Sequence, residues 1–274
     1  VVPHVGDGAL EVVRKCVFVL ALLTLVGSLS YLANDMVILP TAARDLYAQS
    51  GNKYNPDAPV SLPEELENFD FLPGMDDSFK LLYTENTDLR GFITYKSNKA
   101  NDFLKINLPI VRGIDNAYYL KHDFHKNETK YGCLFFDMRN TIETPEDHNK
   151  SLIIYGHNMR DGSMFSTLVE YKAQAYYDEH PEMYLVTPEG GYVVEVFSAF
   201  VASPEESGSE TSPWALEWKD SGAYTTWLSA MQERSVIETG VSVTSSDKVL
   251  TLSTCTNGGA DRFIVMGRLV DVTE

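Results

Sequence analysis

The sequence predicts a mainly β fold, an antiparallel barrel or sandwich of seven or eight strands rather than a doubly wound sheet. The chain has 274 residues, 44% of them hydrophobic and 11% aromatic, which is enough for one substantial core or two small ones. From Gly91 onward, short runs rich in β-branched and aromatic residues alternate with turn residues, as in proteins built from many short strands. Only two helical patterns interrupt these runs.

The first element is an apolar run without charge from Cys16 to Asn34. At about 1.5 Å per residue, a helix of this length just crosses a hydrocarbon core of about 30 Å. Arg14 and Lys15 precede the run, which by the positive-inside rule places residues 1–15 in the cytoplasm and the rest of the chain outside the cell. We therefore expect a single-pass anchor over residues 16–34 in the cell membrane. A cleaved signal peptide is the alternative, although its apolar region is usually only about 7 to 15 residues long.

Residues 35–75 are expected to form a helical lead-in and a linker, followed by the main domain at 76–274. One helical face of the lead-in would gather Ala42, Ala43, Leu46 and Tyr47. The linker is predicted over 52–63, which holds three prolines and few large apolar residues. A second helical face, with Phe79, Leu82 and Tyr83, opens the main domain.

The β-type runs of the main domain are separated by turn residues. In order they are GFITY (91–95), INLPIVRG (106–113), YGCLFF (131–136), SLIIYG (151–156), EMYLV (182–186), GYVVEVFSAFV (191–201), KVLTLSTC (248–255) and RFIVMGRLV (262–270). Helices are predicted over 163–178 and over 221–234, where apolar residues recur at i, i+3, i+4 and i+7. The polar stretch 203–213 is predicted to be a flexible rim or lid.

Charge and cysteine content exclude several classes of protein. With 39 acidic and 22 basic residues, the formal charge of −17 repels phosphate backbones, so we expect no nucleic-acid partner. The three cysteines, Cys16, Cys133 and Cys255, are too few for a disulfide framework and lack the paired spacing of a structural zinc site. We expect neither a metal ion nor a cofactor.

Cys255 ends an apolar strand, and the next six residues, TNGGAD, predict a turn before a returning strand that begins at Arg262. If the two strands pair, Cys255 and Arg262 stand at the mouth of one hairpin, with backbones about 5 Å apart. A guanidinium there favours thiolate over thiol or neutralises an oxyanion. Taken singly, such a cysteine is more often a buried small hydrophobe and such an arginine a solvated charge.

His157 is the one histidine of six that ends a β run. His4 lies in the N-terminal tail, and the remaining four histidines fall in polar stretches. A cysteine and a histidine brought together at strand ends form a nucleophile and base pair. His157 and Cys255 are therefore the candidate catalytic pair.

Three segments, in their order and spacing, resemble the sortases, the membrane-anchored cysteine transpeptidases of Gram-positive bacteria. They are YGHNM (155–159), TLSTC (251–255) and RFIVMGRLV (262–270), where the family signature is a TLxTC strand followed by an arginine. Further segments resemble class B in particular: N-x-D-x-x-G-F-I (86–93), LPIVRGIDNAYYLKHDF (108–124), GCLFFDMRN (132–140), YGHNMRDGSMFSTL (155–168) and a long helix-bearing insertion (203–237). The resemblance spans about residues 76–272.

The resemblance implies a closed sortase-type β-barrel of about eight strands, with N-terminal helices and a helix in the long loop before the strand of the catalytic cysteine. It implies that Cys255 is the nucleophile, His157 the acid and base, and Arg262 the electrostatic partner. Thr256 stands where some relatives carry a glutamate, so this chain lacks that carboxylate.

By position in the matching motifs, Asn116, Leu120 and Ser253 resemble the class B residues that line the sorting-signal groove. The insertion at 203–237 is expected to read substrate rather than to hold the core, because core strands need only short connections.

The implied reaction cleaves a C-terminal sorting signal of the NPxTx or SPxTG type after threonine, through a thioacyl enzyme. The secreted protein is then joined to an amine of a peptidoglycan cross-bridge or of lipid II. Three alternatives remain: a class B pilin polymerase that uses a lysine amine, a secreted cysteine endopeptidase that uses the same pair, and a non-enzymatic extracellular binding module. In the last, Cys255, His157 and Arg262 would lie apart.

Overall fold

The computed structural model describes residues 2–39, 41, 45, 54, 61–66, 69–95, 107–142, 149–188 and 190–272. By its contacts the chain divides into two units, Val1–Leu46 and Tyr47–Glu274. The predicted helical face at 42–47 and most of the predicted linker at 52–63 lie outside the described residues.

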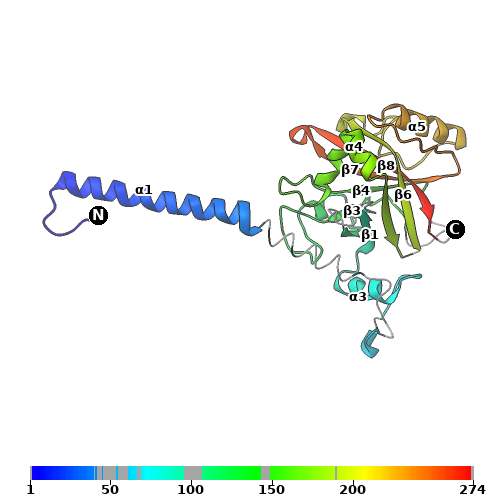
Figure 1. Ribbon diagram of the computed structural model, residues 1–274. Coiled ribbons are helices and arrows are strands. Elements are labelled where there is room, and N and C mark those ends of the chain that lie inside the picture. The colour runs from blue at the N-terminus through cyan, green and yellow to red at the C-terminus, as the bar shows by residue number, and fades with distance from the viewer. Residues whose placement is uncertain are drawn as a thin grey trace. The chain divides into compact units, whose positions relative to one another are not determined.

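The first unit contains the long helix α1 (Ala9–Ala33), which continues as a π-helical turn, η1 (Asn34–Ile38) (Figure 1). None of its residues is buried. The combined helix is long and apolar enough to cross a membrane, a property that signal sequences share. The apolar run predicted at 16–34 falls entirely inside this combined helix, Ala9–Ile38.

The second unit contains a closed eight-stranded barrel, so the predicted barrel is confirmed. Its strands are β1 (Leu89–Tyr95), β2 (Asn107–Val111), β3 (Leu134–Phe136), β4 (Ser151–Tyr155), β5 (Glu182–Thr187), β6 (Gly190–Ala202), β7 (Lys248–Thr256) and β8 (Asp261–Asp271). They follow one another around the barrel as β1-β2-β3-β4-β7-β8-β6-β5.

The expectation of an all-antiparallel sheet is wrong, because β2 pairs with β3 and β4 pairs with β7 in parallel. Parallel neighbours need long crossover connections. The chain between β4 and β7 supplies one by passing through β5, β6 and the insertion. Run spacing along a sequence locates strands but does not say which of them become neighbours.

Helix α3 (Asp77–Glu85) begins where the Asp76 side chain accepts a hydrogen bond from the Phe79 amide. It buries the predicted apolar face, with Leu82 and Tyr83, in a cluster that also contains residues of β1, β2 and β3 and of the loop after β2. That loop includes the short 3₁₀ helix η3 (Tyr118–Leu120).

The helix predicted over 163–178 is divided into the 3₁₀ helix η5 (Phe165–Lys172) and α4 (Gln174–Glu179). Ala173 separates them because its backbone is extended, with φ −104° and ψ 127°. A short 3₁₀ helix, η2 (Glu64–Leu66), precedes α3, and η6 (Pro204–Glu206) and η7 (Asn257–Gly259) lie in loops.

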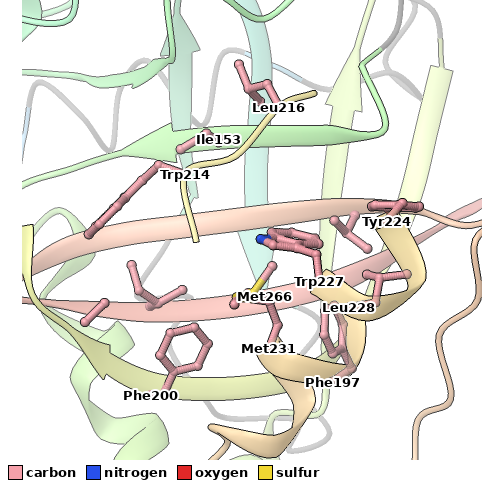
Figure 2. Close-up of a cluster of buried hydrophobic side chains, with 13 residues drawn as sticks. Ile153, Phe197, Phe200, Trp214, Leu216, Tyr224, Trp227, Leu228, Met231 and Met266 are labelled. Carbon is pink, nitrogen blue, oxygen red and sulfur yellow. The ribbon is translucent and has the colours of Figure 1, made fainter. Parts of the chain in front are cut away.

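The insertion carries α5 (Ser221–Glu233), within one residue of its predicted end. Figure 2 shows α5 laid against the barrel, with the large side chains of both interleaved. The insertion contributes Trp214, Leu216, Tyr224, Trp227, Leu228 and Met231 to this cluster, and the barrel contributes Ile153, Phe197, Phe200, Ala202, Val249, Ile264 and Met266. The expectation that the insertion does not hold the core is therefore wrong: it builds a second core on the outside of the barrel.

The stretch 203–213, predicted to be a flexible lid, is fastened at its start. Ser203 and Glu206 form a reciprocal capping box at η6. Arg234, just after α5, pairs with Glu206 at 2.7 Å and lies over the Phe200 ring. These contacts tie the stretch to β6 and to α5.

Candidate active site

His157 lies two residues past the end of β4, and Cys255 lies near the end of the neighbouring strand β7. The strands run parallel with Tyr155 opposite Ser253, and the same register carried two residues further would put His157 opposite Cys255. Beyond the end of β4, Asn158 Nδ2 donates to the Cys255 carbonyl at 2.8 Å, which ties the residue after His157 to Cys255. This arrangement is consistent with the predicted meeting of the two side chains.

On the other side of β7, Cys255 pairs directly with Arg262 of β8, as predicted. The turn between them is tight because Gly258 (φ 69°) and Gly259 (φ 95°) adopt left-handed backbone conformations. Arg262 Nη1 donates to the carbonyls of Gly259 and Asp261, both at 3.0 Å, which holds the guanidinium against the turn. The half-buried, free Cys255 is thus on a strand that lies between β4, which leads to His157, and β8, which carries Arg262.

The imidazole of His157 is fixed by a backbone carbonyl. Its Nε2 lies 2.8 Å from the Leu120 oxygen. A carbonyl oxygen only accepts, so Nε2 must carry the proton of the neutral ring, and Nδ1 is left as the basic nitrogen. This is the tautomer that a general base at Nδ1 requires.

The three residues predicted to line the groove differ in access. Leu120 is partly exposed and its carbonyl touches His157. The Asn116 side-chain oxygen accepts from the Met138 amide at 2.7 Å, which joins the loop after β2 to the turn after β3. Ser253 is only 2% exposed, and its hydroxyl accepts from Trp214 Nε1 at 3.2 Å. Leu120 and Asn116 lie in the same loop after β2 and are accessible to solvent, whereas Trp214 of the insertion covers Ser253.

Comparison with known proteins decides the family. A sortase domain matches residues 102–270 of the chain. The chain belongs to the sortase family. It is 31% identical to sortase B of Listeria monocytogenes over 197 residues, which is 71% of this chain and 74% of that protein. It is 28% identical to sortase B of Staphylococcus aureus over 198 residues, or 71% of this chain and 75% of that protein.

Solved structures agree with this assignment. The Staphylococcus aureus sortase B–substrate complex superposes with a TM-score of 0.69 at 25% identity and covers 86% of this chain and 99% of that one. A Bacillus anthracis protein described as similar to sortase B gives a TM-score of 0.67 at 30% identity, with coverage of 84% of this chain and 97% of that one. This sortase is thus a class B member and a sortase-type cysteine transpeptidase. Sortases in general act on proteins that carry sorting signals and on cell-wall amines.

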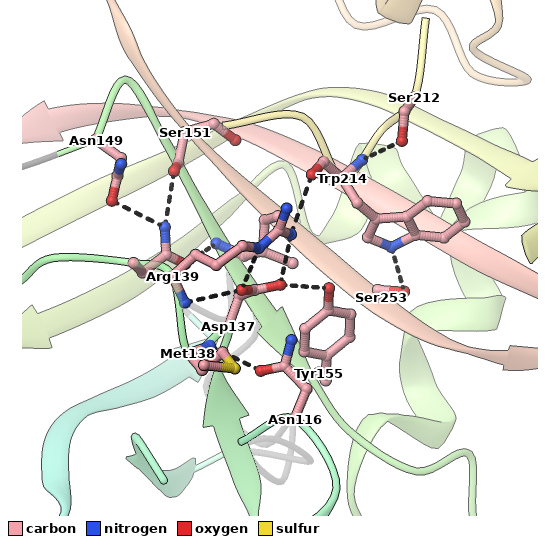
Figure 3. A network of polar contacts seen from close by, with 12 residues as sticks. Asn116, Asp137, Met138, Arg139, Asn149, Ser151, Tyr155, Ser212, Trp214 and Ser253 are labelled. Carbon is pink, nitrogen blue, oxygen red and sulfur yellow. Dashed lines mark hydrogen bonds and ion pairs between the residues drawn. The ribbon is translucent and has the colours of Figure 1, made fainter. Parts of the chain in front are cut away.

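A polar network that the sequence did not predict lies next to the candidate site (Figure 3). It joins the turn after β3, strand β4 and the insertion. The buried Asp137 carboxylate accepts from Arg139 Nε and Nη2, both at 2.8 Å, and from the Tyr155 hydroxyl at 2.8 Å. Although burial opposes it, these bonds hold the pKa of Asp137 below its usual value. Arg139 also donates to the Trp214 carbonyl at 3.4 Å. This bond ties the insertion to the barrel at Trp214, whose indole contacts Ser253, two residues before Cys255.

Some of these residues left a signal in the sequence. Asp137 and Arg139 directly follow an apolar strand in GCLFFDMRN, and on an extended chain their i, i+2 spacing puts them on the same side. Asn158 is adjacent to the candidate base. Trp214 left no comparable signal, because an aromatic residue in a long loop does not show which strand it will cover.

Proposed function

We propose that this sortase cleaves a C-terminal sorting signal after threonine and transfers the secreted protein to a peptidoglycan amine. The supporting observation is the register of β4, β7 and β8: Cys255 pairs with Arg262, and Tyr155, two residues before His157, pairs with Ser253, two residues before Cys255. A nucleophile, a base and a cation on one face of a sheet supply the groups that acyl transfer requires.

In the first stage the Cys255 sulfur attacks the threonine carbonyl carbon, and the C–N bond that follows threonine breaks. Arg262 stabilises the charge that develops on the carbonyl oxygen. As the sulfur attacks, His157 Nδ1 takes the proton of the Cys255 thiol, and it then gives this proton to the departing amine. The products are a thioester on Cys255 and the free C-terminal peptide.

In the second stage an amine of a peptidoglycan cross-bridge or of lipid II attacks the thioester. His157 takes a proton from this amine, the new amide bond forms, and Cys255 leaves as the thiolate. One solved sortase B structure is a complex with triglycine, a short peptide with a free amine. That complex favours an oligoglycine as the first acceptor to test here.

The signal is of the NPxTx or SPxTG type, as class B membership suggests. Asn116, Leu120 and Ser253 line its groove, with Leu120 next to His157. Since Trp214 covers Ser253, contact between the peptide and Ser253 requires the indole to move. Otherwise the peptide meets Trp214 in its place.

The chain is anchored in the cell membrane by residues 16–34, with residues 1–15 in the cytoplasm and the catalytic domain, residues 76–274, outside. Residues 35–75 connect the two. The exposed apolar helix α1 supports this topology, and a membrane location raises the effective concentration of a membrane-tethered substrate.

The test is a competition among fluorescent peptides that differ only at the first position of the pentapeptide, with Asn, Ser or Leu, in the presence of triglycine. We expect the Asn- or Ser-led peptide to be cleaved after threonine and the product mass to include triglycine. The Cys255→Ala variant is the control for cleavage by contaminants.

Other outcomes separate the alternatives. Preference for the Leu-led peptide would contradict the class B signal but not the transpeptidation. A product that has gained water even at saturating amine would favour an endopeptidase. Faster transfer to a pilin-type lysine peptide than to triglycine would favour the pilin polymerase.

A further inference from the structure

We propose that Asn86, Asp88 and Tyr119 form a polar cluster that positions the Leu120 carbonyl and, through it, the imidazole of His157. The cluster lies far from Cys255 in the sequence, and it gives the N-x-D motif at 86–88 a role in the reaction. The inference rests on the proposed role of His157 as the acid and base.

Tyr119 is the centre of the cluster and directly precedes Leu120. Its side chain is fully buried. The hydroxyl donates to Asp88 Oδ2 at 2.6 Å and accepts from Asn86 Nδ2 at 3.0 Å. Burial and the bond to Asp88 raise the pKa of Tyr119, so the hydroxyl remains a donor. These two bonds hold the Tyr119 ring in one orientation, and the ring in turn holds the backbone that continues into Leu120 and its carbonyl.

The other two members anchor the cluster to separate elements. Asn86 ends α3, and its Nδ2 also donates to the Phe124 carbonyl at 2.8 Å, on the far side of η3. The Asp88 amide donates to Asn86 Oδ1 at 2.9 Å, and the Asp88 carboxylate pairs with Lys126 at 2.9 Å. The loop that carries Leu120 is therefore held at Tyr119, just before Leu120, and again at Phe124 and Lys126, just after it.

Gly132 shows how closely the chain packs on the backbone of Leu120. Its φ is +62°, and a Cβ placed there would collide with the Tyr119 oxygen and lie 3.0 Å from the Leu120 oxygen. Any side chain at 132 would push against the same carbonyl that accepts from His157. The position requires glycine both for its backbone conformation and for this approach.

The consequence for the site is orientation. Which ring nitrogen of a histidine carries the proton depends on the hydrogen bond that the other elements offer it. A Leu120 carbonyl that can drift no longer holds the proton on Nε2, so the Nδ1–H tautomer, which cannot accept a proton at Nδ1, gains population. Asn86, Asp88 and Tyr119 are thus positioning residues that never touch the substrate.

The experiment uses Tyr119→Phe in the full chain. This variant should fold, because each partner of the lost hydroxyl keeps a second bond: Asp88 to Lys126, and Asn86 to the Phe124 carbonyl. The matched control is Tyr224→Phe. Tyr224 is also buried, and its hydroxyl donates to the carbonyls of Lys150 and Asp247 at the opposite ends of β4 and β7.

Two measurements are compared in both variants. The ring nitrogen chemical shifts of His157, assigned with His157→Gln, report the tautomer population. The kcat and KM for a sorting peptide report the chemistry. We expect Tyr119→Phe to raise the Nδ1–H population and to lower kcat about fivefold to tenfold with KM changed less than about twofold. Tyr224→Phe should change neither, although it lowers Tm.

An unchanged tautomer population in folded Tyr119→Phe, or an equal change in Tyr224→Phe, would overturn the inference. If Tyr119→Phe does not fold, Asp88→Asn gives the same reading, because it keeps the shape of a half-buried side chain and weakens the acceptor of the Tyr119 hydroxyl. Failure of the proposed function is a separate result: His157→Gln would then retain turnover, whatever its ring had shown.

Discussion

One face of the β4–β7 strand pair is core at one end and the candidate site at the other. On β7, every residue from Val249 to Thr254 is buried, and Cys255 is the first that is partly exposed. On β4, Ile153 is fully buried in the cluster built by the insertion, and His157, just past the strand end, is half-buried. The two ends of the strand pair share one register. They differ in whether the insertion covers them.

The comparison teaches that a strand's side-chain alternation does not separate core from site. Thr251, Ser253 and Cys255 share a face and are all small. Trp214 and α5 lie over that face as far as Ser253 and leave Cys255 accessible. The insertion thus decides where the candidate groove begins. If the two ends are independent, substitutions at the open end should change turnover and substitutions at the covered end should change stability.

The largest effect is expected at the open end. Cys255→Ala should lower kcat/KM by at least about 10⁴-fold, because it removes the nucleophile, while Tm stays within a few degrees. The control is Cys133→Ala: burial raises the pKa of the Cys133 thiol, so this second cysteine stays protonated and cannot take over. We expect Cys133→Ala to lose stability and keep turnover. Substantial cleavage by Cys255→Ala would refute the assignment.

At the covered end the effect should fall on stability. Trp227 is 1% exposed at the centre of the outer cluster, and its Nε1 donates to the Ser212 carbonyl at 2.8 Å. Trp227→Ala should lower the free energy of unfolding by about 3–5 kcal/mol in urea titrations. Exposed Val236→Ala in the same insertion is the control. If folded Trp227→Ala loses most of its kcat, the two ends are coupled and the comparison is wrong.

The boundary between the ends is the Asp137 network. Asp137→Asn should lower the free energy of unfolding by about 2 kcal/mol at neutral pH, since the bonds from Arg139 lose their charged acceptor. The pKa of Asp137 is depressed in the folded state, so the contribution is complete above the unfolded value of about 3.9 and is lost as pH falls through the folded value. The stability gap between wild type and variant should therefore close below about pH 4. A gap that stays constant with pH would assign the loss to shape and not to charge.

A smaller effect, again at the open end, is expected from Arg262→Lys. A point charge does not reproduce the planar fork of a guanidinium, so kcat/KM should fall about tenfold, or about 1.4 kcal/mol. Arg268→Lys is the matched control, because Arg268 lies on the same strand and bonds Glu195 at 2.9 Å away from the site. A loss for Arg262→Lys no larger than that of the control would make Arg262 a background charge.

The strands of the fold could be predicted from the sequence because each is a short apolar run between turn residues. Every predicted run corresponds to an observed strand, and the Gly258–Gly259 turn fixes the β7–β8 pairing locally. The parallel pairing of β4 with β7 could not be predicted, since it joins segments almost a hundred residues apart. For the same reason the strand-end positions of His157 and Cys255 marked them as a candidate pair without showing that they are neighbours, and the β4–β7 register now supports that pair.

Contacts made by loops were the least predictable part of the site. Trp214 over Ser253 and the Leu120 carbonyl beside His157 are set by tertiary packing of segments with no periodic pattern. The charged pair of Asp137 and Arg139 was visible as a motif, but its role as a link to the insertion required the position of the Trp214 carbonyl. Sequence patterns identified the candidate reacting groups, whereas packing identified the residues that contact and cover them.

The smallest effect should follow from removal of residues 1–33. The comparison between the two ends of β4 and β7 concerns only the second unit, and none of the residues of α1 is buried. An apolar helix with no buried residue suits a bilayer. The barrel is closed by its own eight strands and does not include α1. The shortened chain should therefore keep kcat/KM for a soluble sorting peptide within about twofold of the full chain in detergent, which is below about 0.5 kcal/mol.

The same pair of proteins, mixed with lipid vesicles and sedimented, should separate, with only the full chain in the pellet. Loss of peptide cleavage or aggregation of the shortened chain would mean that α1 belongs to the folded domain, and equal sedimentation of both chains would contradict the anchor while leaving the chemistry of Cys255 untouched.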